Sequence, residues 1–218
     1  MKNKKVSHFT WEGIEVVLQD PLGENISLKS VLNRVSDSVP AHLRKEVDSI
    51  YVGNYDFLLK RGVNAVFENG AIFVTNEQST EEDMVDDIIH EIAHSLEVKY
   101  GELLYGDRKL SEEFLSKRKE LWFLLSEEGY SLDLEIYLNV KFDSTFDYYL
   151  NQQVGYPMLA IITPNLFFSP YAATSLREYF ANGFEAVFYH RDSERLKKIS
   201  PILFDKISQL MYNKNYEI

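Results

Sequence analysis

The segment from Ser79 to about Tyr100 constrains the fold more than any other part of the sequence, because it specifies a long helix with two different faces. Ser79 or Thr80 can cap its start, and Gly101 stands just past its expected end. Apolar residues recur at helical spacing and predict one buried face, formed by Val85, Ile88 or Ile89, Ile92 and Leu96. The sequence therefore predicts a helix that packs on the rest of the chain through this face.

The other side of the same predicted helix carries Asp87, His90, Glu91 and His94. Two neutral imidazoles four residues apart can bind one Zn²⁺ from a rigid helix, and the glutamate between them can reach an activated water without being a ligand. The alternative is a pair of surface histidines on a solvated face. The order of the three residue types favours a zinc site over that alternative.

Length and composition predict that residues 1–218 form a single domain, since 45% of the residues are hydrophobic and no repeat or Gly/Ser/Pro linker divides the chain. Residues 1–78 are expected to form a mixed α/β part with a hairpin, and residues 79–218 a mainly helical part that carries the metal site. The expected fold class is α+β, with a small mixed or antiparallel sheet, the metal-site helix and C-terminal helices.

Periodicity and turn signals predict the individual elements. Strands are expected from Ile14 and over residues 49–53, and a hairpin over residues 64–75, where Asn69-Gly70 suits a tight turn with positive φ angles. Helices are expected over residues 27–39, 41–47, 110–129, 175–190 and 192–211, with Pro201 kinking or restarting the last of them. Residues 143–170 are rich in aromatic side chains and give no clear secondary-structure prediction.

Charge and cysteine content exclude several classes of function. The chain has 34 acidic and 23 basic residues, a formal net charge of -11, which argues against a nucleic-acid partner and favours neutral or basic peptides. Because there are no cysteines, disulfides, thiolate metal sites and cysteine nucleophiles are excluded. Any metal must therefore be bound by His, Asp or Glu.

The N-terminal stretch has a basic start without an apolar run behind it, and no later stretch is long enough to span a bilayer. We therefore expect no secretory signal, no membrane partner and a cytoplasmic location. Export by a dedicated device, or packaging into a particle, stays open as an alternative, and no assembly partner is indicated by the sequence.

A catalytic zinc site generally takes three protein ligands and leaves a fourth position for water, so a third ligand has to be found. The three remaining histidines, His8, His42 and His190, are each isolated in the sequence. A carboxylate on a second helix is the better candidate, and Glu178 fits best because a packing stripe of phenylalanines runs beside it. The other candidates are Glu185, Glu97, Glu112 and Glu113.

The start of the second helix bears on this choice. Ser175 and Glu178 form a possible capping box, which would commit the Glu178 side chain to a backbone amide. If Thr174 caps the helix instead, Glu178 is free to bind a metal.

Two motifs together resemble a known family. The first is HEIAH over residues 90–94, and the second is Y-x6-E-Y-F-A-x-x-F, made by Tyr171, Glu178, Tyr179, Phe180, Ala181 and Phe184. They resemble the catalytic domain of anthrax lethal factor and the related secreted Pro-Pro endopeptidases, which are zinc metallopeptidases of the gluzincin type with a zincin-like fold. The resemblance covers roughly Asn64 to Met211 and is tight only in the two motif helices.

The resemblance implies His90, His94 and Glu178 as zinc ligands, Glu91 as general base, and Tyr171 as the hydroxyl that steadies the reaction intermediate. This sequence departs from the family at Asn182, where a carboxylate usually follows the ligand glutamate by four residues. The Asn182 carbonyl oxygen can still accept a hydrogen bond from a ligand histidine, or Asp87 can serve in its place. The interval between His94 and Glu178 is also longer than in compact relatives, so residues 101–170 are expected to carry extra structure.

These observations predict a zinc-dependent endopeptidase that acts on peptide or protein substrates. One alternative is a non-catalytic component with a zincin fold in a larger assembly such as a virion. Another is a zinc hydrolase that acts on esters or amides other than peptides.

Overall fold

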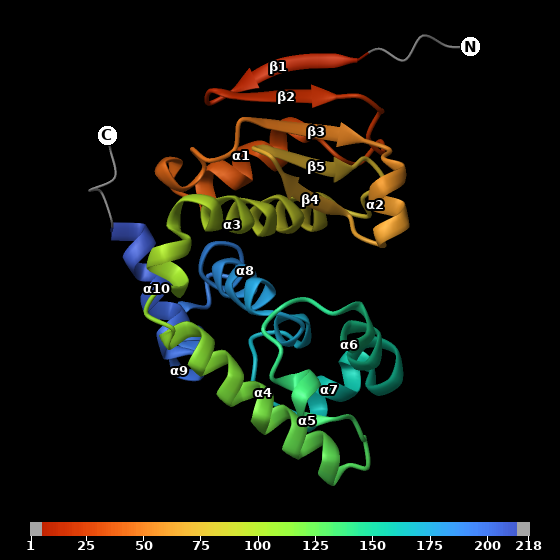
Figure 1. The fold of residues 1–218 in the computed structure, drawn as a ribbon. Coiled ribbons are helices and arrows are strands. Elements are labelled where there is room, and N and C mark those ends of the chain that lie inside the picture. The colour runs from red at the N-terminus through yellow and green to blue at the C-terminus, as the bar shows by residue number, and fades with distance from the viewer. Residues whose placement is uncertain (1–5, 213–218) are drawn as a thin grey trace. The chain divides into compact units, whose positions relative to one another are not determined.

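A computed structural model describes residues 6–212 and divides into two compact units, residues 1–99 and residues 100–218 (Figure 1). The boundary falls inside one helix, α3 (Glu81–Tyr105). The expectation of a single domain over the whole chain stays a prediction. Among the described residues, none of the helices combines the length and the apolar character needed to cross a bilayer.

The first unit contains a five-stranded mixed sheet, which confirms the predicted α+β class. Its strands are β1 (Ser7–Trp11), β2 (Ile14–Leu18), β3 (Ser49–Gly53), β4 (Ala65–Glu68) and β5 (Ala71–Thr75). They lie in the order β1-β2-β3-β5-β4 (Figure 1), with parallel pairing between β2 and β3 and between β3 and β5. The hairpins β1/β2 and β4/β5 are antiparallel, so β1 and β4 form the two edges.

Strand β1 was not expected from the sequence. Its first four residues are exposed, so it lacks the alternation of apolar and polar side chains that marks a half-buried strand. The tight turn into β2 is made by Glu12 and Gly13, which both have positive φ angles, 50° and 91°.

Four helical segments accompany the sheet in this unit: α1 (Leu28–Ser38), a 3₁₀ turn η1 (Ala41–Leu43), α2 (Asp56–Arg61) and the first part of α3. The helix expected over residues 41–47 is wrong beyond the single turn of η1. There Arg44 turns its guanidinium back to the carbonyl of Val39 and to the carboxylate of Glu12, which fixes a compact loop in place of further helix.

The core of this unit is aliphatic. Buried side chains of the sheet and of α1 and α3 form it: Val16, Ile50, Val52, Ile72, Val74, Val31, Leu32, Val35, Ile88, Ile89 and Ile92. Burial of each such side chain stabilises the fold by about 1.5–3 kcal/mol. The buried face predicted for the segment from residue 79 is therefore the face that packs.

Helix α3 starts as predicted and ends later than predicted. The Thr80 hydroxyl accepts a hydrogen bond from the Asp83 N–H at 3.1 Å and caps the start. The helix does not stop before Gly101 but runs on to Tyr105, because Tyr100 and Leu104 continue its buried apolar period. A glycine inside a helix costs only about 1 kcal/mol, which this packing outweighs.

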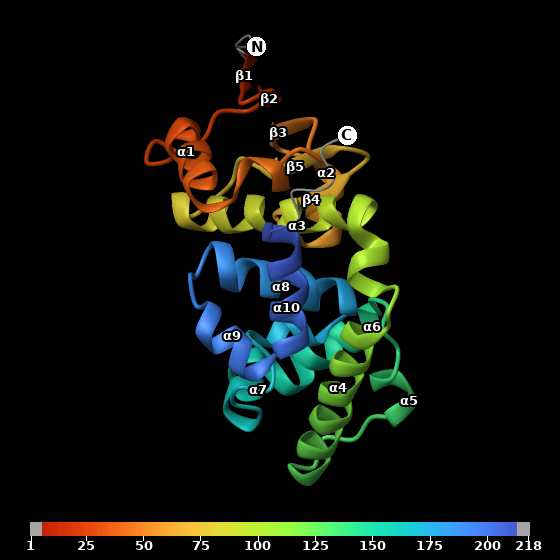
Figure 2. The same cartoon turned by 90° about the vertical axis from the view of Figure 1, so that its left-hand side faces the viewer.

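The second unit is helical. Its elements are α4 (Lys109–Glu127), α5 (Leu134–Tyr137), α6 (Ser144–Tyr148), a π-helix η2 (Tyr149–Gly155), α7 (Tyr156–Ile162), a 3₁₀ turn η3 (Pro170–Ala173), α8 (Leu176–Phe188), α9 (Ser193–Ile199) and α10 (Pro201–Tyr212). Helix α8 is almost fully buried and contacts η3, α4, α9 and α10, as Figure 2 also shows for α10. Pro201 restarts the chain as α10, one of the two outcomes predicted for it.

Three buried cations donate hydrogen bonds to backbone carbonyls of this unit. Lys117 Nζ donates to the carbonyls of Leu166 and Ile199, both at 2.6 Å. Lys206 Nζ donates to the carbonyl of Leu103 at 2.6 Å and also pairs with Asp107 at 3.0 Å. The third cation, Arg118, is 1% exposed.

The Arg118 guanidinium joins three segments. It donates to the carbonyls of Ala173 at 2.5 Å, Thr174 at 3.3 Å and Ile136 at 2.9 Å, and it lies over the ring of Phe146 with 3.9 Å to the centroid. Burial lowers its pKa to about 9, so the carbonyl acceptors and the aromatic ring are what stabilise its charge. Arg118 thereby fixes the backbone between η3 and α8.

One carboxylate organises the start of α10. Glu113 on α4 accepts hydrogen bonds from the Tyr179 hydroxyl of α8 and from the N–H groups of Ile202 and Leu203, at 2.8–3.1 Å. Since the first N–H groups of a helix have no partner within the helix, Glu113 acts as a cap supplied from another helix.

Candidate metal centre

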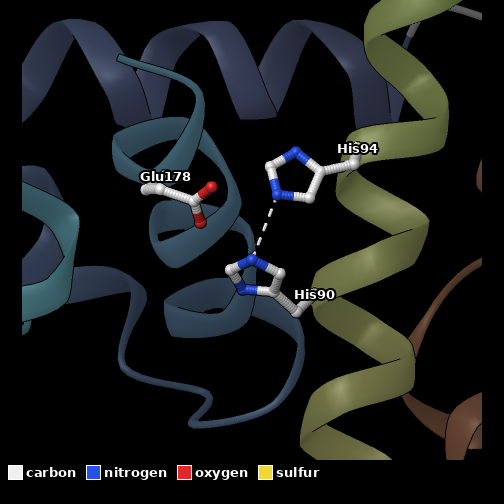
Figure 3. A group of neighbouring side chains, drawn as sticks. All are labelled: His90, His94 and Glu178. Atoms are coloured by element: carbon white, nitrogen blue, oxygen red, sulfur yellow. Dashed lines mark hydrogen bonds between the residues drawn. The ribbon is translucent and has the colours of Figure 1, made fainter. Parts of the chain in front are cut away.

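His90 and His94 face each other on α3 with the geometry of two ligands to one ion. Their Nε2 atoms lie 3.1 Å apart, and their rings are nearly perpendicular at 76° (Figure 3). Two nitrogen ligands at about 2.0–2.1 Å from a tetrahedral zinc stand about 3.3 Å apart. The helix therefore presents both nitrogens at the separation that one zinc ion requires.

Glu97 orients His94. Its carboxylate lies 3.0 Å from His94 Nδ1, and both side chains are about nine-tenths buried. A carboxylate on the far nitrogen holds the imidazole ring in place and directs the other nitrogen toward a metal. Glu97 is one of the candidates for the third ligand, but the structure places it at His94 Nδ1, whereas His94 Nε2 is the atom that faces His90.

His90, His94 and Glu178 form a group that could hold a metal ion, because one ligand atom from each lies within 4.8 Å of the others (Figure 3). Ser175, not Thr174, caps α8, and its hydroxyl accepts from the Glu178 N–H at 3.2 Å. Of the two caps that the sequence left open, the Thr174 cap is therefore not formed. The Ser175 cap nevertheless leaves the Glu178 carboxylate within this group.

Glu185, the alternative on the same helix, belongs to a different group. It could share an ion with Asp86 and His190. Asn182 Nδ2 donates to Glu185 Oε2 at 2.8 Å, whereas the buried Asn182 Oδ1 has no hydrogen-bond partner among the residues that the structure describes. In this structure Asn182 thus positions Glu185, and the expected bond from its oxygen to a ligand histidine is not formed.

Glu91, on α3, is 7% exposed. Its Oε2 accepts a hydrogen bond from the backbone N–H of Phe67, on the edge strand β4, at 2.6 Å. This bond gives a carboxylate oxygen that is largely shielded from water a hydrogen-bond partner.

Asp87 stands one turn before His90 and Glu91 on α3. Burial raises its pKa to about 6, although Gln78 Nε2 donates to its Oδ2 at 2.7 Å and the neighbouring His90 favours the charged form. Near neutral pH Asp87 is therefore an anion next to the histidine pair, as expected for a residue that supports a ligand.

Tyr171 lies in η3, one turn before α8. Its carbonyl accepts from both the N–H and the hydroxyl of Thr174, which fixes the turn. The ring of Tyr156 packs against the Tyr171 ring with 6.4 Å between centroids. Burial and a hydrogen bond to Asp147 raise the pKa of Tyr156, with smaller effects from Tyr171 and Glu178. The Tyr156 hydroxyl therefore lies near both Tyr171 and Glu178.

The remaining candidates have other roles. Glu113 caps α10, Glu112 is exposed, and His8 pairs with Glu15 at the outer sheet edge. Sequence reasoning missed the orienting role of Glu97, the Phe67 N–H and Tyr156. Only Glu97 left a local signal, because it stands three residues after His94 on the same helix.

Comparison of the chain with protein-family models, curated proteins and solved structures gives no match. The interpretation of the centre therefore depends on its own residues and their geometry.

Proposed function

We propose that this chain is a zinc-dependent endopeptidase with a zincin-like fold of the gluzincin type. The observation that carries the proposal is the pair of His90 and His94 nitrogens 3.1 Å apart, grouped with the Glu178 carboxylate and followed directly by the buried Glu91. This is the residue set of a catalytic zinc site with two histidines and one glutamate.

The donor set suits zinc in particular. Two imidazoles and one carboxylate are ligands that zinc prefers, and three protein ligands leave a fourth position open. The Glu97 carboxylate on His94 supplies the outer partner that zinc-binding histidines generally have. When bound, zinc would lower the pKa of a water molecule toward about 7 and polarise a substrate carbonyl.

Side chains of the protein carry out proton transfer, stabilise the developing charge and orient the histidines. Glu91 takes the proton from the attacking water through the carboxylate oxygen that Phe67 leaves open, and later passes it to the departing amine. The Tyr171 hydroxyl donates to the oxygen of the carbonyl as negative charge builds there. Glu97 holds His94 in orientation, and Asp87 favours a cation at the histidine pair through its charge.

An extended peptide is the substrate that suits the neighbouring sheet. Strand β4 is an edge of the sheet and lies next to Glu91. Ala65 on this edge strand has main-chain groups that face away from the sheet, and such groups pair with an added peptide strand, whereas the N–H of Phe67 is held by Glu91. The net charge of -11 favours neutral or basic peptides over acidic ones.

Zinc content and peptide cleavage, measured on the same preparations, test the proposal. Wild type should bind one zinc ion and cleave a peptide library. Glu91→Gln should keep the metal and lose about a hundredfold to ten-thousandfold in kcat/KM, because only the proton transfer is removed. Glu178→Ala should lose both metal and turnover, and Tyr171→Phe should lose about a hundredfold in kcat with the metal retained.

Glu82→Gln is the matched control, since Glu82 is exposed on the same helix and its ion pair with Arg34 is a surface pair. A Glu91→Gln protein with full activity would overturn the assignment of the base. Zinc binding without cleavage of any peptide would favour a non-catalytic component, or a hydrolase of esters or of amides other than peptides.

A further inference from the structure

The hydrogen bond between Phe67 and Glu91 depends on the register of one hairpin. Asn69 and Gly70 have φ angles of 51° and 83°, the values of a two-residue turn of type I′. In such a hairpin the residues that flank the turn, Glu68 and Ala71, form a hydrogen-bonded pair. The next pair, Phe67 and Ile72, is then a non-hydrogen-bonded pair.

A second bond confirms this alternation of hydrogen-bonded and non-hydrogen-bonded pairs. The Thr75 N–H donates to the carbonyl of Asn64 at 2.8 Å, so odd-numbered residues of β5 bond toward β4 and even-numbered residues of β4 bond toward β5. The N–H of Phe67 consequently faces away from β5. It is met by the Glu91 carboxylate at 2.6 Å.

Glu91 has one oxygen engaged and one oxygen available as a result. The bond from the Phe67 N–H to Oε2 restricts the rotation of the Glu91 carboxylate. A one-residue change in the length of the turn would reverse the parity and direct the Phe67 N–H toward β5.

We infer that the backbone N–H of Phe67 positions Glu91, so that Oε2 is held by the strand and Oε1 faces the reacting water. The inference rests on the proposed function, in which Glu91 is the general base. Phe67 is thus a positioning residue that acts through its main chain, and the side chain at this position is secondary.

Removal of the N–H tests the inference in the full-length, zinc-loaded protein. Phe67→Pro lacks the donor, and proline is tolerated at an edge position whose N–H is not part of the ladder. We expect kcat to fall about 10- to 100-fold with KM and zinc content unchanged, because a displaced base impairs the chemical step alone. Phe67→Ala keeps the donor and should lose far less kcat than Phe67→Pro.

An ester at the same position removes the donor with the side chain retained, and covers the case in which Phe67→Pro does not fold. Incorporation of the α-hydroxy analogue of phenylalanine at residue 67 should reproduce the loss of kcat. Equal kcat values for this ester and wild type would overturn the inference.

Hydrogen exchange provides a readout that needs neither metal nor activity. In the metal-free protein, the Phe67 amide should be protected from exchange although it lies on the outer side of an edge strand. Glu91→Ala should remove that protection and leave the amide of Val66, which bonds toward β5, protected. Rapid exchange of the Phe67 amide in wild type would refute the positioning bond, whereas a protein without peptidase activity but with this protection would refute only the proposed function.

Discussion

The two units hold the side chains of the candidate site by different means. In residues 1–99, the histidine pair and Glu91 stand on a regular helix that packs on an aliphatic core. In residues 100–218, Tyr171 and Glu178 stand at the junction of η3 and α8, where the guanidinium of Arg118 fixes the backbone carbonyls. The difference shows that irregular backbone can be held in one conformation when a buried cation takes the place of a regular hydrogen-bond pattern.

The largest effect should come from removing that cation. Arg118→Met removes the side-chain donor of three carbonyls, of which Ile136 keeps the N–H of Asn139, and each buried carbonyl left unsatisfied costs about 1–3 kcal/mol. Relief from burying a charge offsets part of this cost, so we expect a loss of about 3 kcal/mol in the free energy of unfolding. The measurement is urea unfolding followed at Trp122, with Trp11 reporting on the other unit.

Lys119→Met is the matched control for Arg118→Met, because Lys119 is the exposed neighbour on α4. Equal midpoints for the two variants would show that the carbonyl contacts of Arg118 contribute nothing measurable.

Asp87 offers the opposite case, a half-buried acid in the first unit. Its folded-state pKa of about 6 lies above the usual value near 4, so folding favours the protonated form and stability falls as the pH rises through this interval. Asp87→Asn should therefore raise the free energy of unfolding of the metal-free protein near neutral pH by up to about 3 kcal/mol, with no gain near pH 4. Urea unfolding at both pH values checks this, and the exposed Asp37→Asn should change neither.

Glu97 tests whether the regular helix alone orients the histidines. Glu97→Ala should weaken zinc binding about 10- to 100-fold, because His94 loses the partner of its Nδ1. Competition with a chelator measures the apparent Kd. Glu97→Gln keeps an acceptor and should lose less, while an unchanged Kd in Glu97→Ala would show that the helix suffices.

Two helix glycines give the smallest effects, with opposite signs. A Cβ at Gly183 would lie 2.5 Å from a methyl carbon of the buried Leu203, so Gly183→Ala should destabilise the protein by about 1–3 kcal/mol. A Cβ at Gly101 meets nothing within 4 Å, so Gly101→Ala should stabilise it by about 0.5–1 kcal/mol. Thermal unfolding of both variants compares the close helix packing at Gly183 with the open helix surface at Gly101.

Local signals made part of the fold and of the site predictable. The Thr80 cap, the apolar period of α3 and the Asn69-Gly70 turn each depend on residues within a few positions of one another. The prediction that α3 ends before Gly101 is wrong, because Leu104 continues the buried face beyond this glycine.

Non-local contacts account for what the sequence could not predict. The parallel pairing of β2, β3 and β5 joins distant segments without a local pattern. Arg118 bonds carbonyls up to 56 residues away, and carbonyls are present in every residue, so no residue type marks such a contact. The contact of the Phe67 N–H also leaves no signal in the sequence, because its direction depends only on which residues of β4 bond to β5.

The Glu113 carboxylate has a consequence for the order of folding. It bonds to residues that follow it by 66 to 90 positions, and such long loops are slow to close. On the ribosome, α4 is complete long before the start of α10 is synthesised. We therefore expect the helical unit to reach its final packing late, after the sheet of the first unit has formed.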